Sequence, residues 1–230
     1  MRYFLIVIIS VFATQFATAQ TYEIGVFAGG SNFIGDVGST KYINPNQPVI
    51  GGIFKWNRSS RHSFRLSVLY TNLEGNDLKS DDPRRKERGY SFENQIIEAS
   101  LGIEFTFFDF NLHSRNSNST PYLYTGITVA KHDNFQFNLA GENENVNTSS
   151  LAYGIPMVVG YKTELTDSII IGAEIGARYT FTDELDGSVP DDVDAIDRLA
   201  FGNTNNNDWY VFTGITLTYT FGEKPCYCVF

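Results

Sequence analysis

The sequence predicts an all-β protein, an eight-stranded antiparallel up-and-down transmembrane β-barrel. Three observations predict this fold class. Eight segments alternate apolar residues with small or polar ones at a period of two, the period of a strand with two different faces. Long polar connections alternate with short ones along the chain. The composition, with 15% aromatic residues and 20 glycines among 230 residues, is typical of β structure.

The N-terminus has the features of a secretory signal peptide. Arg2 precedes an apolar run over residues 4–13 and an Ala-x-Ala sequence at residues 17–19. We therefore expect a signal peptide at residues 1–19, a barrel at residues 20–221 and a periplasmic tail at residues 222–230. No later segment approaches the roughly 18 apolar residues of a spanning helix. The net charge of −9 argues against a nucleic-acid partner.

The first four strands are expected at residues 22–30, 49–57, 63–73 and 92–108. Each carries an apolar face, which we assign to the lipid side, and a face of small, polar or charged residues. The apolar faces consist of Tyr22, Ile24, Val26 and Ala28; Ile50, Phe54 and Trp56; Phe64, Leu66, Val68 and Tyr70; and Ile97, Ala99, Leu101, Ile103, Phe105 and Phe107.

The last four strands are expected at residues 122–131, 151–163, 168–182 and 209–221. The final one alternates without a break, and its inner face carries mainly glycine and threonine, which suit a narrow interior. The apolar faces named for these strands are Leu123, Thr125, Ile127 and Val129; Ile169, Ile171, Ala173, Ile175, Ala177, Tyr179 and Phe181; and Trp209, Val211, Thr213, Ile215, Leu217, Tyr219 and Phe221.

The connections predict the orientation of the barrel. Short or moderate links at residues 58–62, 111–121 and 164–167 alternate with long ones rich in Asn, Asp, Gly and Ser. Outer-membrane barrels place short turns in the periplasm and long loops outside the cell. We therefore expect an outer-membrane protein with both termini in the periplasm and long extracellular loops, in contact with membrane lipid.

The inner face predicts a plugged interior. Four acids and four bases fall on it, and they would replace the apolar core if the barrel were soluble. In lipid the apolar face is outside, so the interior can be polar provided that its groups are paired. An eight-stranded barrel has room only for side chains, so we expect a non-conducting interior. The expected interior charge network is Glu23, Lys55, Arg65, Glu98, Glu104, Lys162, Glu174 and Arg178.

Several polar groups in the loops have two interpretations. His132 beside Asp133 suits a lipid-modifying or proteolytic site at the rim, but no nucleophile is placed near it. The acidic residues between 183 and 208 suit Ca²⁺, but their spacing fits no EF-hand, so a solvated acidic loop is the favoured interpretation. We expect no catalytic residue, no cofactor, no metal ligand and no small-molecule substrate.

Two further groups remain open in the same way. The basic residues of the second long loop would meet lipopolysaccharide phosphates or the acidic loop, or be solvated. Cys226 and Cys228, one residue apart in the tail, supply half a zinc site or a mixed disulfide with a partner. The basic residues are Lys79, Arg84, Arg85, Lys86 and Arg88.

Four segments resemble a known family. These are YEIGVFAGGSNFIGDVG at residues 22–38, RGYSFENQIIEASLGIEFTFFDF at 88–110, TPYLYTGI at 120–127 and the closing TYTFGEKPCYC. They resemble the PorG family, small OmpA/OmpX-like outer-membrane barrels of the type IX secretion system of Bacteroidetes. The resemblance covers nearly all of the chain after the signal peptide.

The resemblance implies a non-enzymatic role in protein transport and gliding motility. The protein would dock or anchor the periplasmic ring of PorK-like and PorN-like proteins at the outer membrane. A stand-alone surface barrel for adhesion or envelope stability is the alternative. A ring could touch only the periplasmic turns and tail, so the candidate contact residues are Arg58, Arg61, His62, Glu164, Asp167, Lys224, Cys226 and Cys228.

Overall fold

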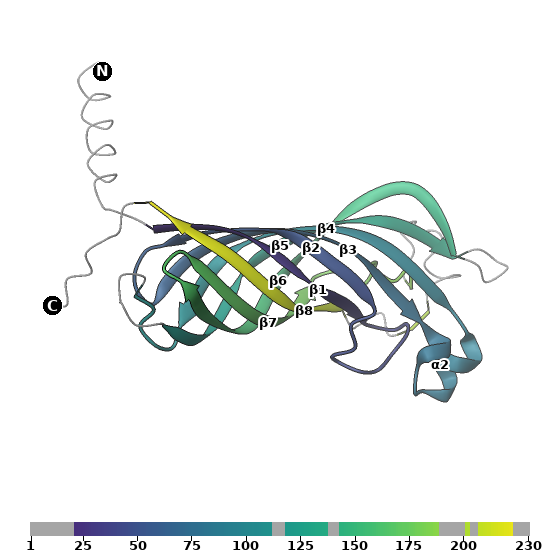
Figure 1. Cartoon of the computed structure of the whole chain (residues 1–230). Helices are drawn as coiled ribbons and strands as arrows, with labels where there is room; N and C mark the ends of the chain where they lie inside the picture. Colours follow the sequence, from purple (N-terminus) through teal and green to yellow (C-terminus); the bar gives the residue numbers. More distant parts are fainter. Residues whose placement is uncertain (1–20, 112–117, 138–142, 189–200, 203–206, 223–230) are drawn as a thin grey trace, which may run out of the picture.

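Eight antiparallel strands close into one barrel (Figure 1). The structure is a computed structural model that describes residues 21–111, 118–137, 143–188, 201–202 and 207–222. The fold class predicted from the sequence is confirmed, whereas the predicted signal peptide and all of the predicted tail except Gly222 lie outside the described residues. The strands are β1 (Thr21–Ile34), β2 (Gln47–Asn57), β3 (His62–Asn76), β4 (Ser91–Thr106), β5 (Ser119–Phe137), β6 (Asn143–Thr166), β7 (Ile169–Thr180) and β8 (Trp209–Phe221).

The two ends of the barrel differ. At one end, which we call the turn end, β1 begins, β8 finishes and short turns join β2 to β3 and β6 to β7. The opposite end, the loop end, carries loop 1 (residues 35–46), loop 2 (residues 77–90) and loop 4 (residues 181–208). Figure 1 shows α2 of loop 2 projecting there, far from the start of β1. The short connections thus lie at one end of the barrel and loops 1, 2 and 4 at the other, as the predicted alternation of lengths requires.

Loop 2 contains two short helices with clear local signals. The helix η2 (Asp77–Lys79) begins after Asn76, whose side chain accepts a hydrogen bond from the backbone N–H of Leu78. The helix α2 (Pro83–Arg88) has Asp82 as its N-cap and proline in its first turn. Gly89 ends α2 with φ of 67°, a conformation that glycine adopts without steric cost.

The hairpin of β5 and β6 is longer than the sequence predicts. Residues 132–150 were expected to be a long loop, but β5 continues to Phe137 and β6 starts at Asn143. His132 pairs with Ser150, and the register shifts between Asp133 and Phe135, which marks a bulge. Polar residues replace the apolar alternation here, so backbone pairing continues without the pattern on which the prediction depended.

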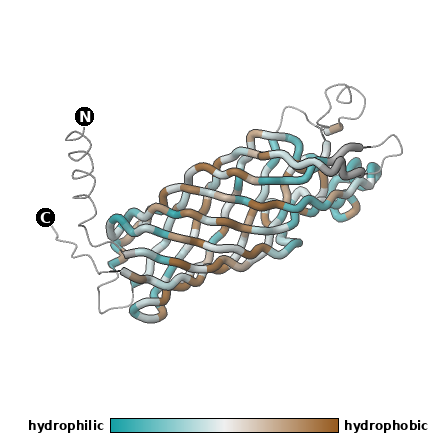
Figure 2. Tube along the Cα trace, turned by 90° about the horizontal axis from the view of Figure 1, so that it is seen from above, coloured by the Kyte–Doolittle hydropathy of each residue, from teal (hydrophilic) through white to brown (hydrophobic). Residues whose placement is uncertain are grey.

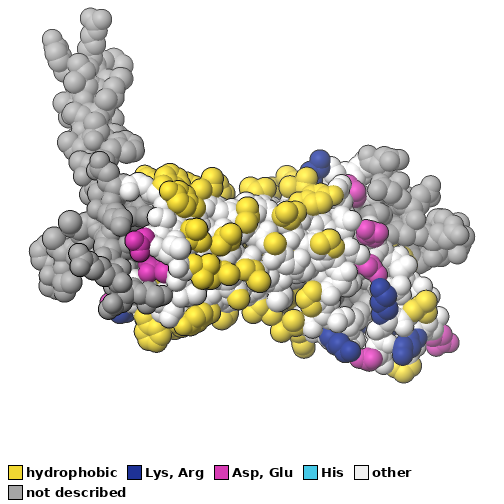
Figure 3. Space-filling model, viewed as in Figure 1, with side chains coloured by type: hydrophobic (Ala, Val, Ile, Leu, Met, Phe, Trp, Pro, Cys, Tyr) yellow, Lys and Arg dark blue, Asp and Glu magenta, His cyan; other side chains and the backbone are white. Residues whose placement is uncertain are grey.

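Apolar side chains cover the outside of the barrel. Figure 2 shows hydrophobic positions distributed along the middle of the strands, and Figure 3 shows charged side chains gathered at the two ends of the visible face. Ile24, Leu101 and Ile215 are more than half exposed although all three are large and apolar. Val211 was expected on this outer face but is only 5% exposed, because it lies in a hollow beside Ile43 of loop 1. Among the described residues, no helix is long and apolar enough to cross a membrane.

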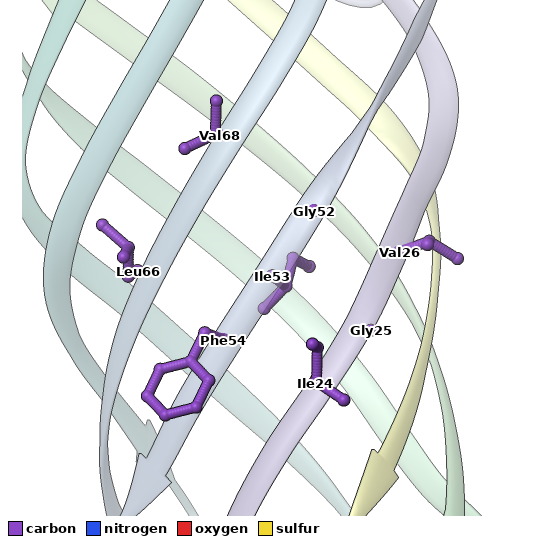
Figure 4. Close-up of a pocket in the computed structure, with 8 residues that line it drawn as sticks. All are labelled: Ile24, Gly25, Val26, Gly52, Ile53, Phe54, Leu66 and Val68. Atoms are coloured by element: carbon purple, nitrogen blue, oxygen red, sulfur yellow. The ribbon is translucent and has the colours of Figure 1, made fainter.

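One position in this outer surface lacks a side chain. Gly52 lies between Val26 and Val68 in adjacent strands, and a methyl group built on it would meet no atom within 4 Å. The result is a shallow apolar hollow of about 540 Å³, also lined by Phe54 and Leu66 (Figure 4). Since this hollow lies on the outer wall, we expect hydrocarbon chains of the membrane to fill it.

Candidate functional site

The interior of the barrel contains every charged residue that the sequence places on the inner face. Each of the eight is at most 5% exposed, so all are removed from water. Charges buried in this way are stable only when paired. The residues are Glu23, Lys55, Arg65, Glu98, Glu104, Lys162, Glu174 and Arg178.

Glu104 on β4 is the centre of the network. Lys55 Nζ lies 2.7 Å from one of its carboxylate oxygens, and Lys162 Nζ donates to the other at 2.7 Å. Arg65 Nη1 is 3.9 Å away from the oxygen that Lys55 contacts. One carboxylate therefore joins cations from β2, β3 and β6, strands on different sides of the lumen.

Arg65 and Glu174 form a two-pronged ion pair across the barrel. Nη1 of Arg65 donates to Oε2 of Glu174 at 2.7 Å, and Nη2 donates to Oε1 at 2.8 Å. This parallel geometry gives strong charge-assisted hydrogen bonds and fixes the angle between the side chains. Because Arg65 lies on β3 and Glu174 on β7, the pair holds together strands that do not neighbour each other in the sheet.

Glu23 completes the group nearest the turn end. Asn57 Nδ2 donates to Oε1 of Glu23 at 2.8 Å, and the Thr218 hydroxyl donates to Oε2 at 2.9 Å. Lys55 lies 3.9 Å away. Three acids and three bases thus meet in this half of the lumen, and their charges balance.

Glu98 and Arg178 form a separate pair nearer the loop end. Arg178 Nε lies 3.3 Å from Oε2 of Glu98, and the Tyr210 hydroxyl donates to the same oxygen at 2.6 Å. Nη1 of Arg178 donates to the carbonyl of Gly176 at 2.7 Å. The guanidinium also lies 4.3 Å from the centre of the Phe212 ring, a cation–π distance.

Sequence reasoning did not assign a role to the interior tyrosines. The hydroxyl of Tyr122 donates to Oε2 of Glu174 at 2.5 Å, and that of Tyr124 donates to Ser100 at 3.0 Å. Arg65 lies 4.8 Å from the centre of the Tyr124 ring. The alternation of side chains along β5 places both tyrosines on the inner face. It does not reveal which charged residues they contact.

The lumen is layered rather than uniformly polar. Toward the loop end an apolar cluster replaces the charges and includes Val37 of loop 1 and Leu185 of loop 4, both 0% exposed. Side chains therefore fill the lumen along its length, from the charged network near the turn end to the loops at the opposite end. The cluster also contains Phe27, Phe33, Val49, Ile53, Leu69, Leu73, Tyr90, Phe92, Ile96, Ala130, Ala152, Tyr210 and Phe212.

His132 and Asp133 at the rim show no catalytic arrangement among the described residues. His132 is 1% exposed, and its Nδ1 lies 3.2 Å from the backbone carbonyl of Asp133. Nε2 of His132 has no hydrogen-bond partner. The imidazole is therefore oriented by the backbone, with no contact to the Asp133 carboxylate that a general base would need.

The basic residues of loop 2 divide into two groups. Arg85 donates to the carbonyls of Gly38 and Gly35 at 3.1 and 2.9 Å, so this guanidinium binds loop 1. Arg88 Nε lies 2.6 Å from Asp77, and Nη2 donates to the carbonyl of Asp36 at 2.7 Å. Of the other members, Lys79 pairs with Glu74 and Arg84 is exposed with Asp82 beside it, while Lys86 is exposed.

The acidic loop differs from its expected solvated form. Asp186 and Asp208 are both 0% exposed, so the expectation is wrong for these two residues. The cause is the fold of loop 4, which inserts Leu185 into the apolar cluster and carries its acidic neighbour with it. Residues 189–200 of this loop lie outside the described residues.

The candidate periplasmic contacts that the structure describes lie at the turn end. Arg58, Arg61, His62 and Asp167 are exposed, whereas Glu164 is half-buried and accepts hydrogen bonds from Asn118. A hydrogen bond from the Arg61 guanidinium, with its charge, lowers the pKa of Asp109. Lys224, Cys226 and Cys228 lie outside the described residues.

An apolar outer surface around a charge-paired interior is the inverse of a soluble protein, and it defines a membrane-spanning β-barrel. The chain matches the model of the domain of unknown function DUF6089 over residues 2–230 and belongs to that family. Comparison with curated proteins finds no match.

Solved barrels of similar shape are distant. The N-terminal β-barrel domain of Pseudomonas aeruginosa OprF has 12% identity and a TM-score of 0.47, covering 87% of this chain and 97% of that one. Ail of Yersinia pestis, solved with the heparin analogue sucrose octasulfate, has 11% identity and a TM-score of 0.47, covering 89% and 99%. Neisserial surface protein A has 11% identity and a TM-score of 0.44, covering 88% and 96%. At this distance the likenesses carry no functional argument.

Proposed function

We propose that the protein is a non-enzymatic outer-membrane component of the type IX secretion system that anchors the periplasmic ring. The observation that carries the anchoring role is the filled, charge-balanced lumen, because Arg65 with Glu174 and Lys55 with Glu104 cross the space that a pore would need. The secretion role rests on the PorG-like segments. A solid barrel suits a fixed attachment point better than a channel or an enzyme.

The ring contact is proposed for the turn end, which would face the periplasm. Arg58, Arg61 and Asp167 are exposed there, and the nine-residue C-terminal tail follows β8. Their mixed charges would complement a polar partner surface. In this orientation loops 1, 2 and 4 face the exterior, away from the ring.

Truncation after Gly222 tests the contact. We expect the shortened barrel to insert normally, because β8 ends at Phe221 and keeps all its pairing with β1. Co-purification of PorK-like and PorN-like ring proteins should fall, whereas Arg84→Ala at the loop end, as the matched control, should leave it unchanged. Full ring recovery with the truncated protein would exclude the tail as the main contact.

A planar-bilayer recording tests the solid interior separately. We expect no steady conductance from the wild-type barrel, since charged and aromatic side chains occupy its cross-section. A large and persistent conductance would contradict the anchor and favour a pore.

A stand-alone surface barrel is the second candidate. The hydrogen bonds from Arg85 and Arg88 to carbonyls of loop 1 favour it, because they organise an exposed end suitable for adhesion. Deletion of the gene separates the two functions. Loss of cargo secretion supports ring anchoring, whereas intact secretion with weaker adhesion or a leakier envelope supports the surface barrel.

A further inference from the structure

Loop 1 folds back over the outer wall of the barrel. The backbone N–H of Asn46 donates to the carbonyl of Ser31 in β1 at 2.9 Å. Gly30 lies on the outer face of β1, and a Cβ atom built on it would come within 2.6 Å of Cβ of Pro45. The missing side chain of Gly30 therefore lets the end of the loop lie directly against the lipid-facing wall.

Asn32 fixes the middle of this loop. Its Nδ2 donates to the carbonyl of Tyr42 at 3.1 Å, and its Oδ1 accepts the N–H of Asn44 at 3.2 Å. Asn32 shares the outer face of β1 with Gly30 but is only 3% exposed, because loop 1 covers it. The hydrogen bonds stabilise a buried amide. Ile43 lies between the two residues that Asn32 holds, so its position beside the wall is fixed.

A groove lies between loop 1 and the neighbouring strands. Tyr42 and Ile43 line one side, and the volume is about 570 Å³, within the range of about 300–1,000 Å³ that is typical of small-molecule sites. The register places Val211, Ala177 and Met157 side by side across β8, β7 and β6, so they form a row of the floor. The other lining residues are Ile34, Gly35, Val159, Ile175 and Trp209.

The groove runs from the membrane interface toward the hydrocarbon. Trp209 begins β8 at the loop end, and its ring centre lies 4.9 Å from that of Tyr179. Aromatic residues at the ends of barrel strands lie at the level of the lipid headgroups. From there the floor continues toward the turn end to Ile175 and Val159, which pair in β7 and β6. A ligand with one polar end and a long apolar chain matches this direction.

The rim formed by loop 1 carries a positive charge. Lys41 precedes Tyr42, and its Nζ lies 3.9 Å from Asp81 with 63% of the side chain exposed. An ion pair that is so long and so exposed contributes little, so Lys41 remains able to attract another anion. A lysine ammonium is a common partner of phosphate. Charge and apolar surface thus meet at the interfacial end of the groove.

We propose that this groove binds one acyl chain of a phosphate-bearing membrane lipid. The chain would lie on Val211, Ala177 and Met157 with Ile43 beside it, and the phosphate would lie near Lys41. A chain in a groove contacts protein on more sides than a chain on a convex wall, and so gains more dispersion attraction. The bound lipid would hold loop 1 against the membrane. This inference goes beyond ring anchoring and does not depend on it.

The hollow beside Gly52 provides a comparison on the same outer surface. Its lining residues all belong to β1, β2 and β3 (Figure 4). A chain that fills this hollow contacts only the shallow wall, so it should exchange freely with the surrounding lipid. The loop 1 groove differs because Tyr42 and Ile43 add a second side to it.

Quenching of Trp209 fluorescence tests the site in the full-length mature barrel. The chain has two tryptophans, so a Trp56→Phe background leaves only Trp209, which lines the groove. The refolded barrel in detergent is titrated with dibrominated phosphatidylglycerol, whose bromine atoms quench an adjacent indole. We expect quenching to saturate at one lipid per barrel. Quenching that rises in proportion to the lipid content of the micelle, without saturation, would overturn the proposal.

Matched variants locate the chain. Ala177→Phe fills the floor of the groove and should weaken the saturable binding at least about fivefold. Ala173→Phe places the same ring on the same face of β7, at an exposed position outside the groove lining, and should leave binding unchanged. Equal binding by these two variants would overturn the assignment.

A loop variant keeps the test decisive if Ala177→Phe does not fold, as judged by the gel shift of folded against heated barrel. Ile43→Ser removes the apolar side of the groove without a change in any strand, and it should cause the same loss of lipid binding. Wild-type binding by folded Ile43→Ser would overturn the proposal.

The headgroup is tested with a second probe. Dibrominated diacylglycerol has the same chains without the phosphate, and it should bind at least about fivefold more weakly than the phospholipid. Lys41→Gln should remove this preference. Equal binding of both probes to the wild-type barrel would overturn the role of the phosphate.

A second copy of the chain is the competing occupant. Sedimentation of the lipid-free barrel in detergent distinguishes it from a lipid. A dimer that Ala177→Phe converts to a monomer would identify the groove as an interface between copies and would overturn the lipid site. A monomer in both cases, together with saturable quenching, supports it.

Discussion

The lumen and loop 4 bury acids in opposite ways. In the lumen, Glu104 contacts two lysines and Glu174 accepts two hydrogen bonds from Arg65, so both of these acids have a base at 2.7 Å. In loop 4, Asp186 and Asp208 are equally buried, and the backbone N–H groups of Ser188 and Leu185 donate to their carboxylates. The first arrangement balances its charges within the chain, whereas no described lysine or arginine forms an ion pair with Asp186 or Asp208.

This contrast determines how the removal of one charge should change the stability of the fold. Removing a charge from a balanced network leaves its partner buried and alone, which is strongly destabilising. Removing a charge from an unbalanced cluster relieves repulsion. The same type of substitution should therefore change stability in opposite directions at the two places.

The largest effect is expected for Arg65→Met. It leaves Glu174 without its cation in the lumen and should lower the free energy of unfolding by about 3–5 kcal/mol. Guanidinium titration of the refolded barrel in detergent measures the change. The double variant Arg65→Met with Glu174→Met is the control, and it should recover much of the loss because no lone charge remains. A double variant as unstable as the single one would show that packing, rather than charge balance, dominates.

A smaller loss is expected for Lys162→Met. Glu104 would lose one cation but keep Lys55 at 2.7 Å, so we expect a decrease of about 2 kcal/mol in the same titration. A loss equal to that of Arg65→Met would mean that the two lysines act as one unit.

Asp208→Asn should change the stability in the opposite direction at neutral pH. Asn keeps an acceptor for the Leu185 N–H and removes a buried charge, so we expect a gain of about 1 kcal/mol. Trp209 follows Asp208 in the sequence, and its fluorescence in a Trp56→Phe background reports the local transition. A loss of stability at neutral pH would contradict the interpretation that the buried charge of Asp208 destabilises the loop end.

The pH dependence follows from the same carboxylates. Burial raises the pKa of Asp186 to about 6, so the folded state binds its proton more tightly than the unfolded state does. The stability of the loop end should therefore be highest below the ordinary aspartate pKa of about 4 and decline as the pH rises to about 7. Urea titration at several pH values measures the decline, and a flat profile from about pH 4 to about pH 7 would contradict it.

The smallest effect is expected at the surface. Arg61 and Asp109 pair at 2.7 Å at the turn end, but both side chains are well exposed. Arg61→Ala should leave the guanidinium midpoint unchanged, because water solvates either partner alone. This null result makes Arg61→Ala suitable for testing ring association without a change in barrel stability.

The strands could be predicted because lipid imposes a simple pattern on them. The predicted bounds of β8, residues 209–221, match the structure, and the structure buries Glu23 and Arg178 where alternation places them. The prediction could not extend to the β5–β6 hairpin, since the sequence there is largely polar and lacks the apolar alternation.

The partners within the lumen could not be predicted from the alternation. Arg65 and Glu174 are 109 residues apart, and their meeting depends on the stagger of all intervening strands. Tyr122 and Tyr210 complete the network through the same geometry. The burial of Asp186 and Asp208 depends on how loop 4 folds back onto loop 1, for which a polar sequence gives no periodic signal.

The seam between β1 and β8 has a consequence for biogenesis. Tyr22 pairs with Phe221 and Ile34 with Trp209, so one edge of β1 has no strand partner until β8 has been delivered. Until then both edges expose unpaired amides that hydrocarbon cannot solvate. Closure of the barrel should consequently be a late, all-or-none event. A nascent chain stalled before residue 209 should persist as an open sheet that depends on chaperones.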